Sequence, residues 1–188
     1  MPTTYTLIAQ TIGLAGMAFN VLSYQQKKQR NIILFQLFGG ALFAVNYFML
    51  GAIVGGCMNV LAVLRAVVFA NKQTFRAEHP AWLWGFMTCY GLSYLLTFTS
   101  FGQPWNWYTG ILELLPIIGM VALTIGFRCK NARDVRRLGL INSPAWLIYN
   151  CANLTIGGIL CEVLSLGSIV IGMLRLDRRT DKAEKDDA

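Results

Sequence analysis

Seven apolar segments, separated by short polar loops, fill almost the whole chain. They lie at residues 5–24, 32–50, 52–70, 81–99, 107–127, 138–153 and 155–174. A helix that crosses a bilayer needs about 20 apolar residues, so a chain of 188 residues has no length left for a separate soluble domain. The composition agrees, since 55% of the residues are hydrophobic and only 13% are charged. We therefore expect an all-α integral membrane protein with seven transmembrane helices.

Lysine and arginine residues gather at every second end of these segments. Of the 16 basic residues, 15 follow the first, third, fifth and seventh segments. Because basic residues mark cytoplasmic loops, the N-terminus is predicted to be periplasmic and the C-terminus cytoplasmic. A six-span alternative, with 81–99 as a half-buried hairpin, would place the basic cluster at 128–137 outside and is disfavoured. The net charge of +7 thus reflects topology, and no nucleic acid partner is expected.

The chain repeats itself weakly at an offset of 103 residues. Residues 12–70 align without a gap with residues 115–173, and ten of the 59 pairs are identical. The same offset superposes the segment ends and the basic loops. We therefore predict two three-helix units, residues 1–70 and 102–175, joined by a loop and fourth helix at 71–101. Three crossings invert the chain and the fourth turns it back, so the units should run parallel. Residues 176–188 are predicted to be a disordered cytoplasmic tail.

Polar side chains inside the predicted spans mark a candidate substrate site. Glu113 and Glu162 each lie six or seven residues from the outer end of a segment. A charged side chain at the centre of a bilayer costs roughly 2.5–3.5 kcal/mol on insertion scales, so both should face the bundle interior. The repeat pairs them with Gln10 and Asn59, which completes a predicted ring of four substrate-binding side chains. Interhelical hydrogen bonding is the structural alternative for this ring.

Aromatic and amide side chains nearby extend the predicted site. Phe43 pairs with Trp146 under the repeat, and we expect these two rings to gate the ring of four. Asn46 and Asn150 lie one turn away and are also predicted to bind substrate.

Three further residues inside the spans need an explanation. Pro116 and Pro144 can kink their helices, because a proline inside a helix frees a carbonyl group. Arg65 lies about five residues from the cytoplasmic end of its segment, so we expect its side chain to snorkel to the interface.

No motif of a known catalytic or metal-binding type is present. The single histidine, His79, has no acidic partner in view, and the five cysteines are dispersed without a C-x-x-C pair. We therefore do not expect an enzyme, and we expect neither a cofactor nor a metal.

The three-plus-one-plus-three plan resembles the SWEET superfamily of small-solute carriers, also called MtN3/saliva or PQ-loop proteins. In that superfamily a Pro-Gln pair ends the first helix of each unit, whereas here residues 24–25 are Tyr-Gln and residues 127–128 are Phe-Arg. Its carriers hold sugar with an Asn on the third helix of each unit. Asn59 matches the first of these, but Glu162 replaces the second, so the resemblance does not imply sugar.

A closer resemblance covers nearly the whole chain. The strings ELLPIIG at 113–119, FRCK at 127–130 and IGGILCE at 156–162 look like the YgjV-type family of bacterial inner-membrane proteins. This resemblance implies the bacterial cytoplasmic membrane, but no settled activity comes with it.

The function expected from these observations is that of a carrier for a small polar or cationic metabolite, working by alternating access. Glu113 and Glu162 would bind a cation, a proton or an amine, while Asn59 and Gln10 hydrogen-bond the solute. The alternative is a receptor or assembly partner that does not transport and whose polar ring binds a ligand or is structural. The expected partners are the lipid bilayer and an unidentified small solute, with homo-oligomerisation left open.

Overall fold

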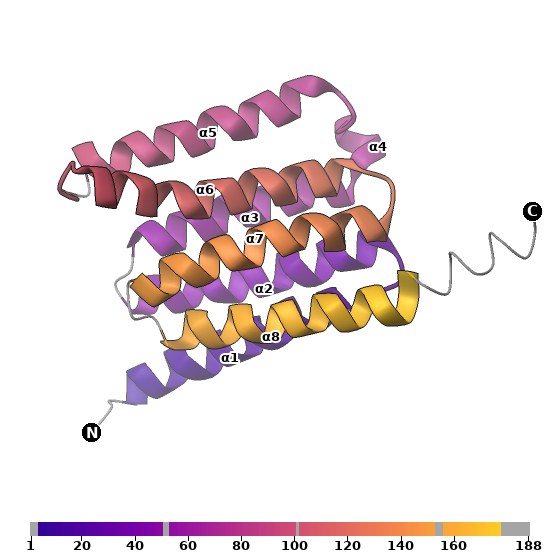
Figure 1. Ribbon diagram of the computed structural model, residues 1–188, viewed down its shortest axis with the longest axis horizontal. Coiled ribbons are helices and arrows are strands. Elements are labelled where there is room, and N and C mark those ends of the chain that lie inside the picture. Colours follow the sequence, from indigo (N-terminus) through magenta and orange to yellow (C-terminus); the bar gives the residue numbers. More distant parts are fainter. Residues whose placement is uncertain (1–3, 51–52, 101, 153–155, 178–188) are drawn as a thin grey trace, which may run out of the picture.

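The computed structural model describes residues 4–50, 53–100, 102–152 and 156–177, and these residues form an all-helical fold (Figure 1). The elements, in chain order, are α1 (Thr4–Ser23), α2 (Gln29–Met49), α3 (Ile53–Ala70), α4 (Lys72–Phe75), α5 (Pro80–Thr99), α6 (Trp107–Arg128), α7 (Ala132–Ala152), α8 (Ile156–Gly172) and the π-helical turn η1 (Met173–Asp177). The predicted all-α class is confirmed.

Within the described ranges, four helical segments are long and apolar enough to cross a membrane. They are α1, α2, α6 and Gly157–Asp177, which joins α8 to η1; α3 contributes a shorter apolar helix, Gly55–Ala70. Large apolar side chains such as Leu14, Ile118 and Ile171 are about half exposed on the surface of these helices. A soluble protein rarely exposes so much contiguous apolar surface, whereas lipid accommodates it. The predicted membrane protein with several apolar helices is therefore supported.

The order and packing of the helices agree with the predicted repeat. Helices α2 and α7 begin 103 residues apart, at 29 and 132. Within each triplet the successive helices pack on one another, α1 on α2 on α3, and α6 on α7 on α8. In Figure 1 the long helices run back and forth between two sides of the molecule, with the start of α1 on one side and α4 and the end of α8 on the other.

The two triplets meet through three helix pairs. Helix α1 contacts α8, α2 contacts α7, and α3 contacts α6, while α5 packs against α6 and α3 at the edge of the bundle. Two of these pairs, α1 with α8 and α3 with α6, correspond to each other under the repeat, and the α2–α7 pair corresponds to itself. The interface between the triplets therefore has α2 and α7 at its centre.

Glycines at repeated positions bring the first two helices of each triplet together. A Cβ atom on Gly16 would lie 3.1 Å from the carbonyl oxygen of Gly39, and one on Gly119 would lie 2.8 Å from Oδ1 of Asn142. Gly39 and Asn142 are themselves 103 residues apart. Small residues allow this close approach, which is the usual basis of helix packing in membranes.

Two sequence-based boundaries differ from the structure. Helix α7 begins at Ala132, six residues before the predicted start at 138, because Arg136 is buried against neighbouring helices instead of lying in a loop. Pro144 is consequently in the interior of α7. At the C-terminal end η1 extends to Asp177, two residues into the predicted tail, and residues 178–188 lie outside the described part of the chain.

Candidate functional site

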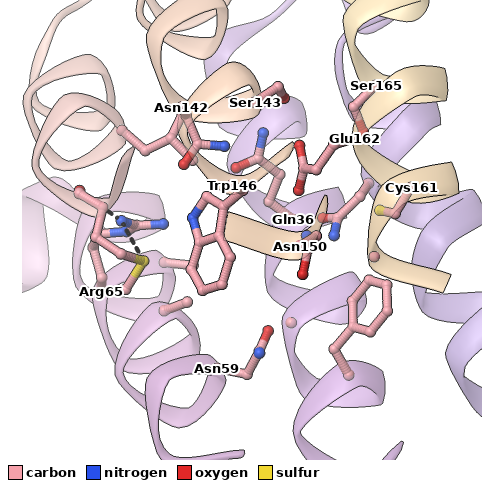
Figure 2. Close-up of a pocket in the computed structure, with 18 of the residues that line it drawn as sticks. Gln36, Asn59, Arg65, Asn142, Ser143, Trp146, Asn150, Cys161, Glu162 and Ser165 are labelled. Atoms are coloured by element: carbon pink, nitrogen blue, oxygen red, sulfur yellow. Dashed lines mark hydrogen bonds between the residues drawn. The ribbon is translucent and has the colours of Figure 1, made fainter. Parts of the chain in front are cut away.

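A cavity of about 110 Å³ lies at the interface of the two triplets (Figure 2). Residues of all six triplet helices line it, together with Tyr24 just after α1, whereas α5 contributes none. The polar side chains in its wall include Asn20, Tyr24, Gln36, Tyr47, Asn59, Arg65, Asn142, Ser143, Asn150, Glu162 and Ser165. Volume for several water molecules and a polar wall inside an apolar bundle make this cavity the candidate site.

Five of the predicted substrate-binding residues line this cavity. Asn59 and Glu162 reach it from α3 and α8, the third helices of the two triplets, and Phe43, Trp146 and Asn150 reach it from α2 and α7. Figure 2 shows Trp146, Asn150 and Glu162 gathered around the same space, with Asn59 on another side of it. The structure therefore brings together side chains that are about 100 residues apart in the sequence.

The predicted ring of four side chains does not form. Gln10 is exposed on α1, and Glu113 is only partly buried on α6 and does not line the cavity. These two residues are repeat equivalents, as are Asn59 and Glu162. Position along a helix sets the depth of a side chain, whereas packing sets the direction in which it points. Packing therefore turns Asn59 and Glu162 toward the cavity, whereas Gln10 and Glu113 point away from it.

Asn46 also lies outside the cavity wall. It is buried, and its Nδ2 atom donates a hydrogen bond of 2.7 Å to the carbonyl oxygen of Ala9. Asn46 therefore connects α2 to α1 within the first triplet.

Arg65 does not snorkel, and that expectation is wrong. The residue is 3% exposed, and its Nη1 atom donates to the carbonyl oxygen of Met120 at 3.0 Å and to Thr124 Oγ1 and Tyr90 OH, each at 3.4 Å. Its guanidinium also lies 4.8 Å from the centre of the Phe127 ring, within cation–π range. Carbonyl, hydroxyl and aromatic groups thus replace the water that snorkelling would have reached.

A sequence signal for the placement of Arg65 exists. Asn59, Ala62 and Ala66 line the cavity from α3, and a spacing of three to four residues marks one face of a helix. Arg65 lies beside this face, three residues after Ala62. Whether the Arg65 guanidinium turns toward this face or toward the helix end depends on its partners in α5 and α6. The spacing of residues within one segment does not reveal those partners.

The cavity wall contains buried polar atoms without protein partners. Nε of Arg65 and Oδ1 of Asn142 form no hydrogen bond in the part of the chain that the structure describes. Most buried polar groups in proteins are hydrogen-bonded, and an unmade bond costs roughly 1–3 kcal/mol. A polar occupant of this cavity would satisfy both atoms, one with an acceptor and the other with a donor.

One cluster of side chains joins the two triplets at the C-terminal end of α6, close to the loop that carries lysine and arginine residues. Gln29, at the start of α2, donates from Nε2 to the carbonyl oxygens of Gly126 and Phe127 at 3.0 and 3.1 Å, and also to that of Cys129. Lys72 Nζ donates to Gln29 Oε1 at 3.0 Å and to the Cys129 carbonyl at 2.6 Å. These donors satisfy carbonyl groups that the end of a helix leaves free. Burial lowers the pKa of Lys72.

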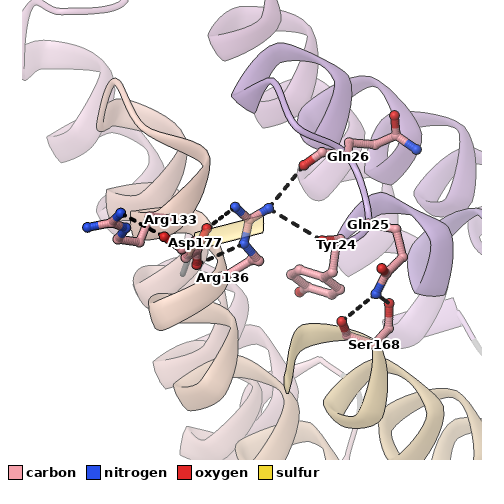
Figure 3. Close-up of polar contacts among 7 residues, drawn as sticks. All are labelled: Tyr24, Gln25, Gln26, Arg133, Arg136, Ser168 and Asp177. Carbon is pink, nitrogen blue, oxygen red and sulfur yellow. Dashed lines mark hydrogen bonds and ion pairs between the residues drawn. The ribbon is translucent and has the colours of Figure 1, made fainter. Parts of the chain in front are cut away.

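A second cluster does the same at the end of α1 (Figure 3). Arg136 of α7 donates from Nη1 to the carbonyl oxygens of Gln26 at 3.0 Å and Tyr24 at 3.4 Å, and it forms a buried ion pair with Asp177 of η1. Gln25 Nε2 donates to Ser168 Oγ of α8 at 2.9 Å.

The two clusters are related by the repeat. The carbonyl groups of Tyr24 and Gln26 lie 103 residues before those of Phe127 and Cys129. In each case a side chain from the second helix of the opposite triplet holds them, Gln29 in one direction and Arg136 in the other. We call these two clusters, Gln29 with Lys72 and Arg136 with Asp177, the basic-end clamps. They connect the triplets on the side of the molecule where the lysine and arginine residues gather.

The exposed apolar helices and the polar cavity between the two triplets are features of a multi-helix membrane protein. Residues 7–180 match the Imp-YgjV family, described as bacterial inner membrane protein, and the chain belongs to that family. It is also 24% identical over 175 residues to the inner membrane protein YgjV of Escherichia coli (strain K12), covering 92% of this chain and 87% of that protein. No solved structure matches the chain. The family and the inner-membrane location predicted from the sequence are confirmed.

Proposed function

We propose that this protein is a SWEET-like carrier of a small polar solute, which exposes the central cavity alternately to either side of the inner membrane. In this proposal α1, α2, α3, α5, α6, α7 and α8 all cross the bilayer, with the N-terminus periplasmic and the C-terminus cytoplasmic. The 103-residue offset between the starts of α2 and α7, the equivalent helix packing in the two triplets and the single long helix α5 between them support the parallel three-plus-one-plus-three arrangement. The location of the basic residues supports the orientation.

The observation that carries the proposal is the composition of the cavity. It lies at the interface of two repeated triplets, and it holds Glu162 together with amide groups such as those of Asn59 and Asn150. Ionisable side chains within membrane spans are costly and usually mark a functional site. A site between repeats can open to either side when one repeat rocks against the other.

The basic-end clamps support a state that is closed toward the cytoplasm. Both clamps join the end of a first helix to the opposite triplet, so separation of the triplets on that side must break them. A carrier needs contacts of this kind on each side that can open, because alternating access requires one closed side at a time.

One observation favours the alternative of a receptor or assembly partner that does not transport. The cavity volume of about 110 Å³ is below the roughly 300–1,000 Å³ of typical ligand pockets. A protein of this kind would bind a small ligand in the cavity, or use it structurally, without moving anything across the membrane.

Flux across sealed liposomes separates the two functions. The purified chain would be reconstituted and tested with a panel of small sugars, amines, carboxylates and amino acids, each followed by isotope uptake. Carriage predicts uptake of at least one class, lost in Glu162→Gln and kept in Glu113→Gln, which removes an acid outside the cavity wall. Ligand-dependent thermal stabilisation without uptake of any class would instead establish a binder. Equal uptake by Glu162→Gln and Glu113→Gln would show that the solute does not pass through this cavity.

A further inference from the structure

We propose that the solute of this cavity is a small zwitterion, a molecule that carries an ammonium and a carboxylate group at the same time. This inference rests on the proposed function and names its substrate class. It is based on the two opposite charges that line the cavity, Arg65 from α3 and Glu162 from α8.

The two charges face one cavity without neutralising each other. Arg65 and Glu162 form no ion pair within 4 Å in the described part of the chain, and Figure 2 shows them on opposite sides of Trp146. Opposite charges attract strongly where water is scarce. Their separation therefore has a structural cause, which is the attachment of Arg65 to the Met120 carbonyl and the Phe127 ring.

The surroundings of Arg65 leave its charge unpaired by any acid. Its hydrogen-bond acceptors are the carbonyl oxygen and sulfur of Met120 and the hydroxyl groups of Tyr90 and Thr124. Its Nε atom is buried and has no acceptor. A guanidinium presents several N–H groups in one plane, which suits a carboxylate better than any other partner. The Arg65 side of the cavity is thus built to receive an anionic group.

The surroundings of Glu162 suit a cation. Hydroxyl and amide side chains accompany it in the cavity wall, among them Ser143, Ser165 and Asn150. Among the described residues, no lysine or arginine other than Arg65 lines the cavity. An ammonium group would gain a charged partner in Glu162 and hydrogen-bond acceptors in its neighbours. In the view of Figure 2 Trp146 lies between the two charges, and its indole supplies apolar surface for the carbon atoms that connect the ends of the solute.

The repeat shows that this charge pattern departs from the symmetry of the fold. Glu162 corresponds to Asn59, and Arg65 corresponds to Ser168. Each third helix therefore contributes one charge, of opposite sign and at a different level. A neutral solute requires neither charge, and a simple amine or a simple acid requires only one. A solute with both groups uses both, and the small volume of the cavity limits it to few atoms.

The test compares matched probes on the full-length protein. L-Alanine carries both groups, isopropylamine has a methyl in place of its carboxylate, and lactate has a hydroxyl in place of its ammonium. Thermal stabilisation and liposome uptake would be measured for these three, and then for the common amino acids, β-alanine and glycine betaine. We expect at least one zwitterion to bind at least tenfold more tightly than both of its single-charge analogues.

Variants assign the two ends of the solute. Arg65→Gln and Glu162→Gln should each weaken zwitterion binding at least tenfold, with Arg65→Lys retaining part of it and Glu113→Gln retaining all of it. If Arg65→Gln fails to fold, Arg65→Lys and Glu162→Gln still test the two charges. Tighter binding of an amine or an acid than of every zwitterion, or no binding by any probe, overturns the inference. Uptake of a single-charge or neutral solute, without uptake of any zwitterion, would overturn the zwitterion inference but would still support the proposed carrier function.

Discussion

At the residue scale, the environment of each polar side chain distinguishes structure from candidate function. Asn46 and Gln10 were both predicted to bind substrate, but Asn46 holds two helices together and Gln10 faces outward. Arg65 and Glu162 instead face a common cavity from opposite triplets. The same residue types therefore serve different purposes depending on the side of the helix that carries them.

Replacement of Asn46 should affect stability. Asn46→Ala removes the buried hydrogen bond of 2.7 Å to the Ala9 carbonyl, which keeps only its bond within α1, so we expect a loss of about 0.5–1.5 kcal/mol. Thermal unfolding in detergent measures this as a lower midpoint. Gln10→Ala is the control, since Gln10 is exposed and should change the midpoint little. Equal effects of the two substitutions would contradict the placement of these side chains.

The lowered pKa of Lys72 predicts a pH effect of known sign. Burial lowers the pKa of its ammonium from the ordinary value of 10.5, so the unfolded chain binds more protons at alkaline pH than the folded chain does. Stability rises with pH wherever the unfolded state binds more protons. We therefore expect the wild type to gain stability relative to Lys72→Met as the pH rises toward 10.5. The test is the unfolding midpoint of the wild type minus that of Lys72→Met, measured from pH 7 to 10. We expect this value to rise with pH, and a constant or falling value would refute the prediction.

At the element scale, the closest helix contacts lie at small residues, whereas other glycines have open space around them. Gly119 approaches Asn142 and Trp146, both of which line the cavity, so the α6–α7 contact also shapes the site. On α5, by contrast, Gly91 has no neighbour within 4 Å of where a Cβ atom would lie.

A pair of glycine substitutions tests this difference. Gly119→Ala would place a Cβ atom 2.8 Å from Asn142 Oδ1 and 3.0 Å from Trp146 Cδ1, and such overpacking costs roughly 1–3 kcal/mol. Gly91→Ala meets open space and should be neutral or stabilising by up to about 1 kcal/mol, because alanine favours the helix. Unfolding midpoints in detergent compare the two. The packing described for α6 and α7 would be wrong if Gly91→Ala were the more harmful change.

At the scale of the whole molecule, two equivalent clamps connect the triplets at the basic end, and the cavity lies between the same triplets. In the proposed carrier, opening toward the cytoplasm would therefore have to break both clamps. Cys161 is a native reporter of that event, since its thiol is buried and lines the cavity.

Loosening a clamp should expose Cys161. In a chain whose other four cysteines are replaced by alanine, we expect Arg136→Ala or Gln29→Ala to raise the rate at which a membrane-impermeant maleimide labels Cys161 in inverted vesicles, by severalfold. Arg137→Ala is the matched control, because Arg137 is exposed beside Arg136. Unchanged labelling in both clamp variants would show that the clamps do not close this side.

The sequence by itself determined that the chain is helical and embedded in a membrane, and it identified the family. These properties follow from strong local constraints. Backbone groups in lipid must form helical hydrogen bonds, and basic residues collect at the ends of apolar segments. Most helix bounds, such as the starts of α5 at Pro80 and α6 at Trp107, therefore lie within a few residues of their predicted positions.

Only the tertiary structure decided which polar side chains share a site. Position in the sequence gives the depth of Glu113 and Glu162 along their helices, but neighbouring helices decide which way each side chain points. The burial of Arg65 depends on acceptors from α5 and α6, and the early start of α7 depends on Asp177 and the carbonyl groups at the end of α1. Each of these outcomes is set by contacts between segments far apart in the chain, and a pattern within one segment does not contain them.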